Sequence, residues 1–186
     1  MKTWTRSKSN AKSATNMRSP KVRFAADTCF LLDTFKGSHK DAACKWIKFF
    51  DKHLGEGGDL IIVPAIVWSE LSVCEEEAAL ILDLGLFEIL PFDQSHAETA
   101  GRFFNELKEE GKLPERAKGA RLTCIDDLKI IASASCAEAN FVLTANDDFT
   151  KFTKRFSKSM IPVNYRNNEP GEEYLSDLKQ IPLIRE

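Results

Sequence analysis

The sequence has no apolar run long enough to cross a membrane. Its longest, LIIVPAIVW at residues 60–68, reaches about half of the ~20 residues that a membrane-spanning helix needs. The N-terminus also lacks the apolar core of a secretory signal, so we expect a cytoplasmic protein with no membrane partner. The five cysteines are odd in number and show no CxxC spacing, which argues against a disulfide framework and against a zinc site.

Acidic residues are absent from the first 23 positions, which carry seven lysines and arginines. The net charge of the whole chain is nevertheless −2, so the remainder is distinctly acidic. Residues 1–21 are polar and rich in serine, and they are predicted to form a disordered basic extension. Two interpretations stay open: an arm that adds sequence-independent attraction to a polyanion, or an extension without a role of its own.

Short apolar segments alternate with amphipathic ones along the rest of the chain. The predicted strands are residues 22–27, 59–63, 86–90, 141–144 and 160–163, and the predicted helices include residues 39–54, 97–111 and the segment DDFTKFTKRF. This alternation predicts one α/β domain over residues 22–165, with a central parallel five-stranded sheet between two layers of helices. Residues 166–186 are expected to form a C-terminal tail that packs on this domain or on a partner.

Carboxylates flank several of the predicted strands. They come from four distant segments: Asp27, Glu70, the pair Asp126–Asp127 and the pair Asp147–Asp148. In open parallel sheets, sites form beyond the carboxyl ends of the strands. We therefore expect these acidic residues to converge on one edge of the sheet.

Each carboxylate also has a structural explanation. A capping-box pattern ends at Asp126, so this residue is predicted to cap a helix that the aspartate pair opens, and Asp147 could do the same behind Asn146. Asp127 and Glu70 are different, because both are predicted to lie toward the apolar sides of their helices. A carboxylate in such a place costs energy unless it is paired or bound to a metal.

Electrostatic repulsion favours a cation among the gathered acids. Two carboxylates ~5 Å apart at an effective dielectric near 20 repel each other by roughly 3 kcal/mol. Carboxylate oxygens select hard ions such as Mg²⁺ or Mn²⁺. Such an ion can activate water and stabilise a phosphoryl oxygen, which is the chemistry of phosphodiester hydrolysis. From the residues alone, a metal site and separate capping or surface roles both stay open.

Four motifs, taken in order, resemble the PIN-domain ribonucleases and, among these, the VapC-type toxins of toxin–antitoxin modules. They are DTCFLLD at 27–33, VPAIVWSEL at 63–71, DLKIIASA at 127–134 and VLTANDDF at 142–149. The resemblance implies a Mg²⁺- or Mn²⁺-dependent endoribonuclease, the toxin of a type II module, with RNA as substrate. It also implies a cognate antitoxin and a homodimer.

The resemblance further implies roles for individual residues. The catalytic and metal-binding residues would be Asp27, Glu70, Asp127 and Asp148, with Asp147 as a further metal ligand and the alternative for the fourth acid. Thr28, Asn146 and Asp126 would support them: Thr28 near the metal or at the strand end, Asn146 by orienting substrate or water, and Asp126 as the cap.

RNA would also need a basic surface. The segment 111–123 precedes the third acidic motif, and Arg116, Lys118 and Arg121 are predicted to contact phosphates there. A solvated surface loop is the alternative.

The sequence leaves two rival functions. One is a catalytically weak or inactive PIN module that binds RNA or a protein. The other is an aspartate-dependent phosphotransfer domain, which is disfavoured because the late strand MIPV offers no lysine. Neither a GxGxxG nor a Walker-type loop follows a predicted strand, which argues against nucleotide binding by those routes.

Overall fold

A computed structural model describes residues 22–54, 61–113, 120–171 and 173–176 of the protein. The predicted basic extension lies outside the described residues, as do Arg116 and Lys118 and the side chain of Arg121. Within the described ranges, no helix is both long and apolar enough to traverse a membrane.

Five parallel strands form one central sheet in the order β3-β2-β1-β4-β5. Their bounds are β1 Phe24–Ala26, β2 Ile61–Pro64, β3 Phe87–Leu90, β4 Phe141–Thr144 and β5 Ile161–Asn164. Every residue of β1, β2 and β4 is buried, which fits their largely apolar sequences; Thr144 at the end of β4 is the polar exception. The predicted five-stranded parallel α/β fold is confirmed.

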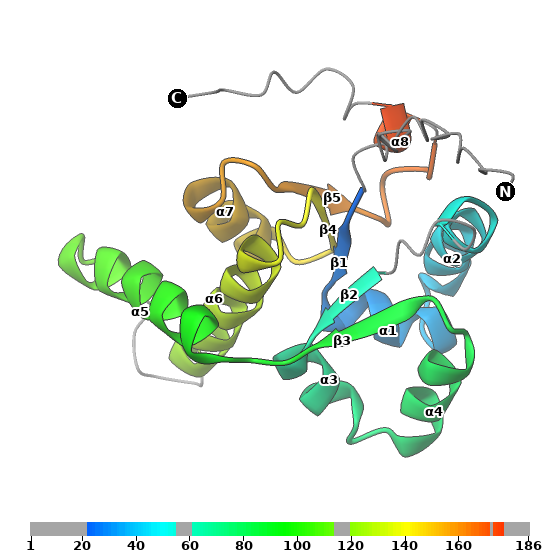
Figure 1. Ribbon diagram of the computed structural model, residues 1–186, viewed down its shortest axis with the longest axis horizontal. Coiled ribbons are helices and arrows are strands. Elements are labelled where there is room, and N and C mark those ends of the chain that lie inside the picture. Colours follow the sequence, from blue (N-terminus) through cyan, green and yellow to red (C-terminus); the bar gives the residue numbers. More distant parts are fainter. Residues whose placement is uncertain (1–21, 55–60, 114–119, 172, 177–186) are drawn as a thin grey trace, which may run out of the picture.

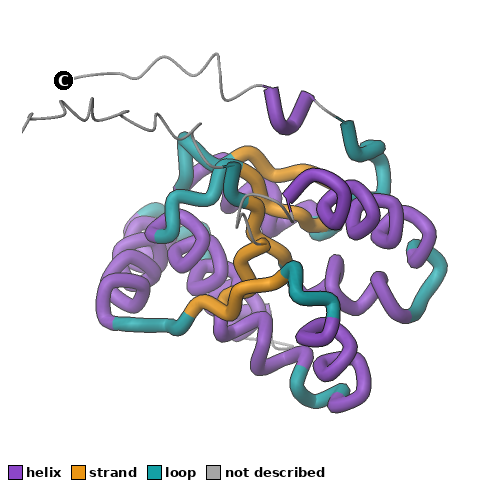
Figure 2. The backbone as a smooth tube through the Cα atoms, turned by 45° about the vertical axis from the view of Figure 1, so that its right-hand side comes forward, coloured by secondary structure: helices purple, strands orange, loops and turns teal. Residues whose placement is uncertain are grey.

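Helices cover both faces of this sheet (Figures 1 and 2). Their bounds are α1 Thr28–Phe35, α2 Lys40–Leu54, α3 Ala65–Leu71, α4 Glu75–Asp83, α5 Gln94–Glu109, α6 Ala120–Cys136, α7 Asp147–Phe156 and α8 Glu173–Ser176. The chain winds in one direction from β1 to β3 and then returns to β4 and β5. Because parallel crossovers are right-handed, α1 and α2 cover one face, whereas α6 and α7 cover the other.

Aromatic side chains fill the core under the middle of the sheet. Phe24 on β1 is fully buried, and its ring centroid lies 5.0 Å from that of Phe141 on β4 and 4.9 Å from that of Phe50 on α2. Rings from three distant parts of the chain, on β1, α2 and β4, therefore pack together. This packing fixes where β1 ends, and with it the position of Asp27.

The start of α6 corrects one prediction. The helix begins at Ala120, so Asp126 and Asp127 lie well inside it and do not open it. The capping role predicted for Asp126 is therefore wrong. Cys124, which is 2% exposed, lies one turn before the buried Leu128 on the same face of the helix.

The described part of the C-terminal segment packs on the body of the domain. The indole N–H of Trp46 donates to the carbonyl of Asn168 at 3.1 Å, and the ring of Tyr174 lies 5.1 Å from that of Trp46. Of the two positions predicted for this segment, packing on the domain is the one observed for its described residues.

Candidate active site

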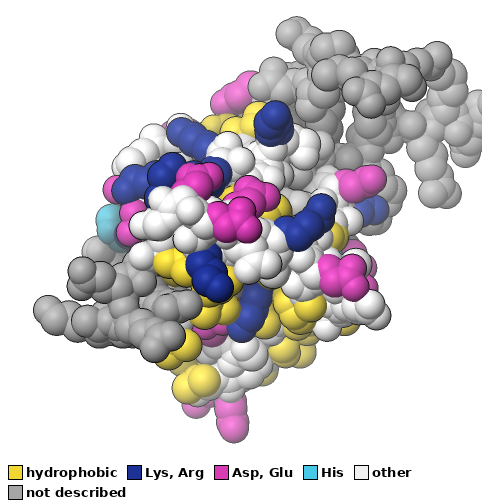
Figure 3. Space-filling view, turned by 90° about the vertical axis from the view of Figure 1, so that its left-hand side faces the viewer, with side chains coloured by type: hydrophobic (Ala, Val, Ile, Leu, Met, Phe, Trp, Pro, Cys, Tyr) yellow, Lys and Arg dark blue, Asp and Glu magenta, His cyan; other side chains and the backbone are white. Residues whose placement is uncertain are grey.

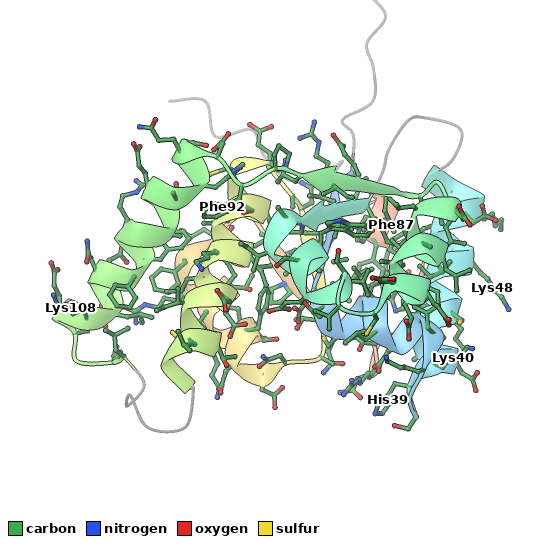
Figure 4. All side chains as sticks on the ribbon, turned by 90° about the horizontal axis from the view of Figure 1, so that it is seen from below. His39, Lys40, Lys48, Phe87, Phe92 and Lys108 are labelled. Atoms are coloured by element: carbon green, nitrogen blue, oxygen red, sulfur yellow. The ribbon has the colours of Figure 1, made fainter. Side chains whose placement is uncertain are left out.

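The predicted site residues lie at the edge where β1, β2 and β4 end. Figure 4 shows the molecule from below relative to the view of Figure 1. At this edge α3 lies next to both α1 and α6. Asp27 follows β1, Glu70 lies on α3, Asp127 on α6 and Asp148 on α7. The sheet topology thus brings together segments that are far apart in the sequence.

Asp27 is the most firmly held of these carboxylates. It is 7% exposed and caps the N-terminus of α1, where its Oδ1 accepts the N–H of Thr28 at 2.7 Å. Its Oδ2 accepts the hydroxyl of Thr144 at 2.8 Å and the thiol of Cys29 at 3.1 Å. Burial raises the pKa of Asp27, and these three hydrogen bonds oppose that rise.

Glu70 lies at the rim of the site. Its side chain is exposed, which corrects the prediction that it lies toward the apolar side of its helix. Val67 and Leu71 form the buried stripe of α3, and Glu70 flanks that stripe on the solvent side. The hydroxyl of Thr28 donates to the Glu70 carboxylate, so Thr28 links the end of β1 to α3.

Asp127 is the second buried carboxylate, with 8% exposure. Burial raises its pKa to about 7, and the negative charges of Asp27, Glu70, Asp126 and Asp148 add to the rise. These carboxylates therefore share one electrostatic environment, as expected of acids gathered at one edge of a sheet. Asp127 faces inward with Ile130 and Ala134, as its position in the sequence predicted.

The second aspartate pair lies at the start of α7. Asn146 caps this helix, because its side-chain oxygen accepts the N–H groups of Asp148 at 2.9 Å and of Phe149 at 3.2 Å. The prediction that an aspartate of this pair is the cap is therefore wrong. Asp147 and Asp148 are both exposed, and Asp148 forms an ion pair with Lys151 at 2.7 Å.

The donor set suits a hard cation, although its members stand apart. All the candidate ligands are carboxylates, whose oxygens Mg²⁺ and Mn²⁺ prefer. Across the described residues, no three side chains of His, Cys, Asp or Glu lie close enough together to hold one metal ion. A divalent ion would relieve the repulsion that raises the pKa of Asp127, so the chemistry of these residues fits such an ion. The carboxylates lie farther apart than the ligands of a bound ion.

Two residues of the site were not singled out from the sequence. Thr144 is the last residue of β4 and Cys29 lies in the first turn of α1, and both contact Asp27. Thr144 is fully buried, and it belongs to the motif VLTANDDF, which is the signal that could have identified it. Burial raises the pKa of the Cys29 thiol to about 12, so it keeps its proton at neutral pH.

Charges of both signs are interspersed on the side of the molecule that carries α5–α7 (Figure 3). Arg155 pairs with Glu110, Lys112 lies 2.7 Å from the same carboxylate, and Lys129 lies 2.8 Å from Asp126. These basic side chains therefore already have acidic partners, and Lys129 is the one of them that lies next to the site. The phosphate contacts predicted for Arg116, Lys118 and Arg121 fall outside the described side chains.

Comparison with known proteins agrees with this architecture. The model of the PIN domain family matches residues 25–155. Among solved structures, the chain is similar to VapBC2 from Rickettsia felis bound to a DNA fragment from its promoter, with 20% identity, a TM-score of 0.55 and coverage of 76% of this chain and 98% of that one. It is also similar to FitAcB from Neisseria gonorrhoeae, with 17% identity, a TM-score of 0.53 and coverage of 78% and 99%.

No protein with a curated description matches the sequence. At these identities the structural likeness concerns the fold, and it agrees with the parallel sheet and its helices. The family model covers well over half of the chain and includes all four acidic segments. The chain therefore belongs to the PIN domain family.

Proposed function

We propose that this protein is a Mg²⁺- or Mn²⁺-dependent endoribonuclease. The observation that carries the proposal is the buried carboxylate of Asp127, whose pKa is raised to about 7 by burial and by the charges of four neighbouring acids. A cluster of carboxylates at the edge of an apolar core does not stabilise the fold by itself. A divalent cation would stabilise such a cluster. Membership of the PIN domain family supports a nuclease.

Asp27, Glu70, Asp127 and Asp148 would hold the ion, with Asp147 as the alternative to Asp148. When bound, Mg²⁺ or Mn²⁺ supplies an activated water and charge stabilisation at the phosphoryl oxygens of RNA. Asp27 and Asp127 are buried, so packing and hydrogen bonds limit their movement. Glu70 and Asp148 are exposed and can adjust their side chains toward the ion. Thr28 orients Glu70 through its hydroxyl.

The matching experiment compares cleavage of RNA by the purified protein with Mn²⁺, with Mg²⁺ and with excess chelator. We expect cleavage only with a divalent ion, and we expect Asp27→Asn and Asp127→Asn to abolish it while the melting temperature in chelator does not fall. Asp83→Asn, an exposed aspartate at the end of α4, is the matched control. Full activity of both site variants would contradict the proposal.

A second candidate is a catalytically weak PIN module that binds RNA or a protein. The open spacing of the carboxylates and the ion pair of Asp148 with Lys151 favour it. RNA binding without cleavage at any Mn²⁺ concentration would distinguish this module from the nuclease.

The similarity to VapBC2 and FitAcB also supports a proposal about the partners of this protein. VapBC2 and FitAcB are complexes, and we propose that this protein is likewise a toxin with an antitoxin partner and that it forms a cytoplasmic homodimer. Light scattering of the purified protein tests the dimer. Co-purification with the product of an adjacent reading frame tests the antitoxin.

A further inference from the structure

Two short side chains connect Asp27 to the turn that follows β4. Thr144 donates its hydroxyl to Asp27 Oδ2 at 2.8 Å, and Cys29 donates its thiol to the same oxygen at 3.1 Å. On their other side, Thr144 Oγ1 accepts the N–H of Asn146 at 3.1 Å and Cys29 Sγ accepts the N–H of Ala145 at 3.3 Å. The N–H groups of Ala145 and Asn146 are thus each connected to Asp27 Oδ2 by a chain of two hydrogen bonds, one through Cys29 and one through Thr144.

Thr144 and Cys29 can each donate one hydrogen bond and accept another at the same time. A hydroxyl and a thiol each carry one hydrogen, and each can also accept a hydrogen bond. Thr144 and Cys29 accept from the backbone of the turn, so each has its single hydrogen available for Asp27. Because Oδ1 is held by the N–H of Thr28, the carboxylate is restrained at both oxygens. Its plane is therefore fixed relative to the turn.

That turn carries the second acidic pair. Asn146 caps α7 and sets the direction in which Asp147 and Asp148 leave the strand. A shift of Cys29 would alter the angle of the Asp27 carboxylate and its relation to α7 together. Cys29 is partly buried and packs against the hydrophobic core, so the test must separate its packing from its hydrogen bonds.

We propose that Cys29 is a positioning residue, which orients the Asp27 carboxylate for ion binding by relaying a hydrogen bond from the β4–α7 turn. This inference rests on the proposed metal-dependent function. Groups that orient metal ligands in this way typically change metal affinity or activity roughly 10- to 100-fold when they are removed. Cys29 itself does not contact the ion or the RNA in this role.

The test compares Cys29→Ala, Cys29→Ser and the wild type by calorimetric titration with Mn²⁺ and by cleavage kinetics. We expect Cys29→Ala to weaken Mn²⁺ binding by about tenfold or more and to lower kcat at fixed Mn²⁺, with KM for RNA unchanged. Serine keeps one hydrogen and an acceptor, so Cys29→Ser should restore most of the lost affinity. A merely structural role would not give this pattern of rescue.

The matched control is Cys44→Ala. Cys44 is also a partly buried cysteine, and its thiol lies 3.6 Å from the carbonyl of Thr34, away from the acidic edge. We expect wild-type Mn²⁺ affinity in this variant. If Cys29→Ala does not fold, Cys29→Val takes its place, because valine fills the space without a hydrogen-bonding group.

Infrared spectroscopy supplies a measurement that does not depend on cleavage. The S–H stretching band of Cys29, obtained as wild type minus Cys29→Ser in chelator, should lie below that of a free thiol because the thiol donates to a carboxylate. A band at the free-thiol frequency overturns the inference, as does equal Mn²⁺ affinity in wild type and Cys29→Ala. A wild-type protein that neither binds Mn²⁺ nor cleaves RNA would instead overturn the proposed function, whatever the position of this band.

Discussion

The two buried carboxylates, Asp27 and Asp127, are an energetic cost to the metal-free protein. A desolvated anion beside other anions is less stable than the same group in water, and a raised pKa is the expression of that cost. Hydrogen bonds from Thr144 and Cys29 offset part of it for Asp27. Burial and the neighbouring charges raise the pKa of Asp127 to about 7, so its ionisation should be visible in the stability of the protein.

The pH dependence of stability tests this directly. The pKa of Asp127 rises from 3.8 to about 7 on folding, so between these values the folded state holds more protons than the unfolded state. Stability should therefore fall as the pH rises through this window. In chelator at about pH 8, we expect Asp127→Asn to be more stable than the wild type by on the order of 4 kcal/mol, whereas at about pH 4 the two should be nearly equal.

Urea unfolding followed by circular dichroism measures both values. Added Mn²⁺ should stabilise the wild type and have little effect on Asp127→Asn, which would reverse their order. Asp83→Asn again serves as the exposed control. An unchanged difference between Asp127→Asn and the wild type from acidic to alkaline pH would show that Asp127 does not ionise as described.

At the scale of single elements, the cap of α7 links helix stability to the site. Asn146 supplies the oxygen that accepts two N–H groups at the start of this helix. We expect Asn146→Ala to lower the free energy of unfolding by about 1 kcal/mol, since its helix loses the cap. Asn146→Asp should retain most of the stability, because a carboxylate oxygen can replace the amide oxygen.

Thermal unfolding in chelator is the measurement, so that any bound ion is excluded. If Asn146→Ala leaves the melting temperature unchanged, the side-chain cap does not contribute. Cleavage of RNA by the Asn146→Asp variant then reports separately on whether this position also orients substrate or water, which stays a prediction.

The individual elements differ in how well local sequence indicates them. The strand at 141–144 was predicted with its observed bounds, because a strand buried on both faces is an unbroken apolar run. The start of α6 was placed too late, because the [ST]xx[DE] pattern that ends at Asp126 occurs inside a helix as readily as at its end. The helix begins at Ala120, and Cys124, upstream of the aspartate pair, is already buried against the core.

At the scale of the whole molecule, the residues that follow β5 pack against α1. Tyr165 is 1% exposed, and its hydroxyl lies 2.6 Å from Asp33 Oδ2 and 3.0 Å from the carbonyl of Cys29. Arg166 lies 2.7 Å from the same Asp33 oxygen. The residues that follow β5 are thus hydrogen-bonded to α1, the helix that Asp27 caps.

Removing one hydroxyl tests this connection. Tyr165→Phe keeps the ring packed against Phe30 but loses a hydrogen bond to a charged group, so we expect the free energy of unfolding to fall by roughly 1.5–3 kcal/mol. Tyr174→Phe, which keeps its ring against Trp46, is the matched control and should change stability little. Chemical denaturation measures both variants. Equal effects would indicate that the Tyr165 hydroxyl is not a specific tie.

The amino-acid sequence by itself determined the α/β class, the parallel five-stranded sheet and the four acidic segments. These follow from apolar runs, helical periodicity and short motifs, all of which are local in the chain. Only the tertiary structure decided which carboxylates are buried, that Glu70 lies at the rim, that Asn146 rather than an aspartate caps α7, and that Cys29 and Thr144 hold Asp27. Burial and hydrogen bonding between β1 and β4 depend on residues more than a hundred positions apart, which no local pattern can report.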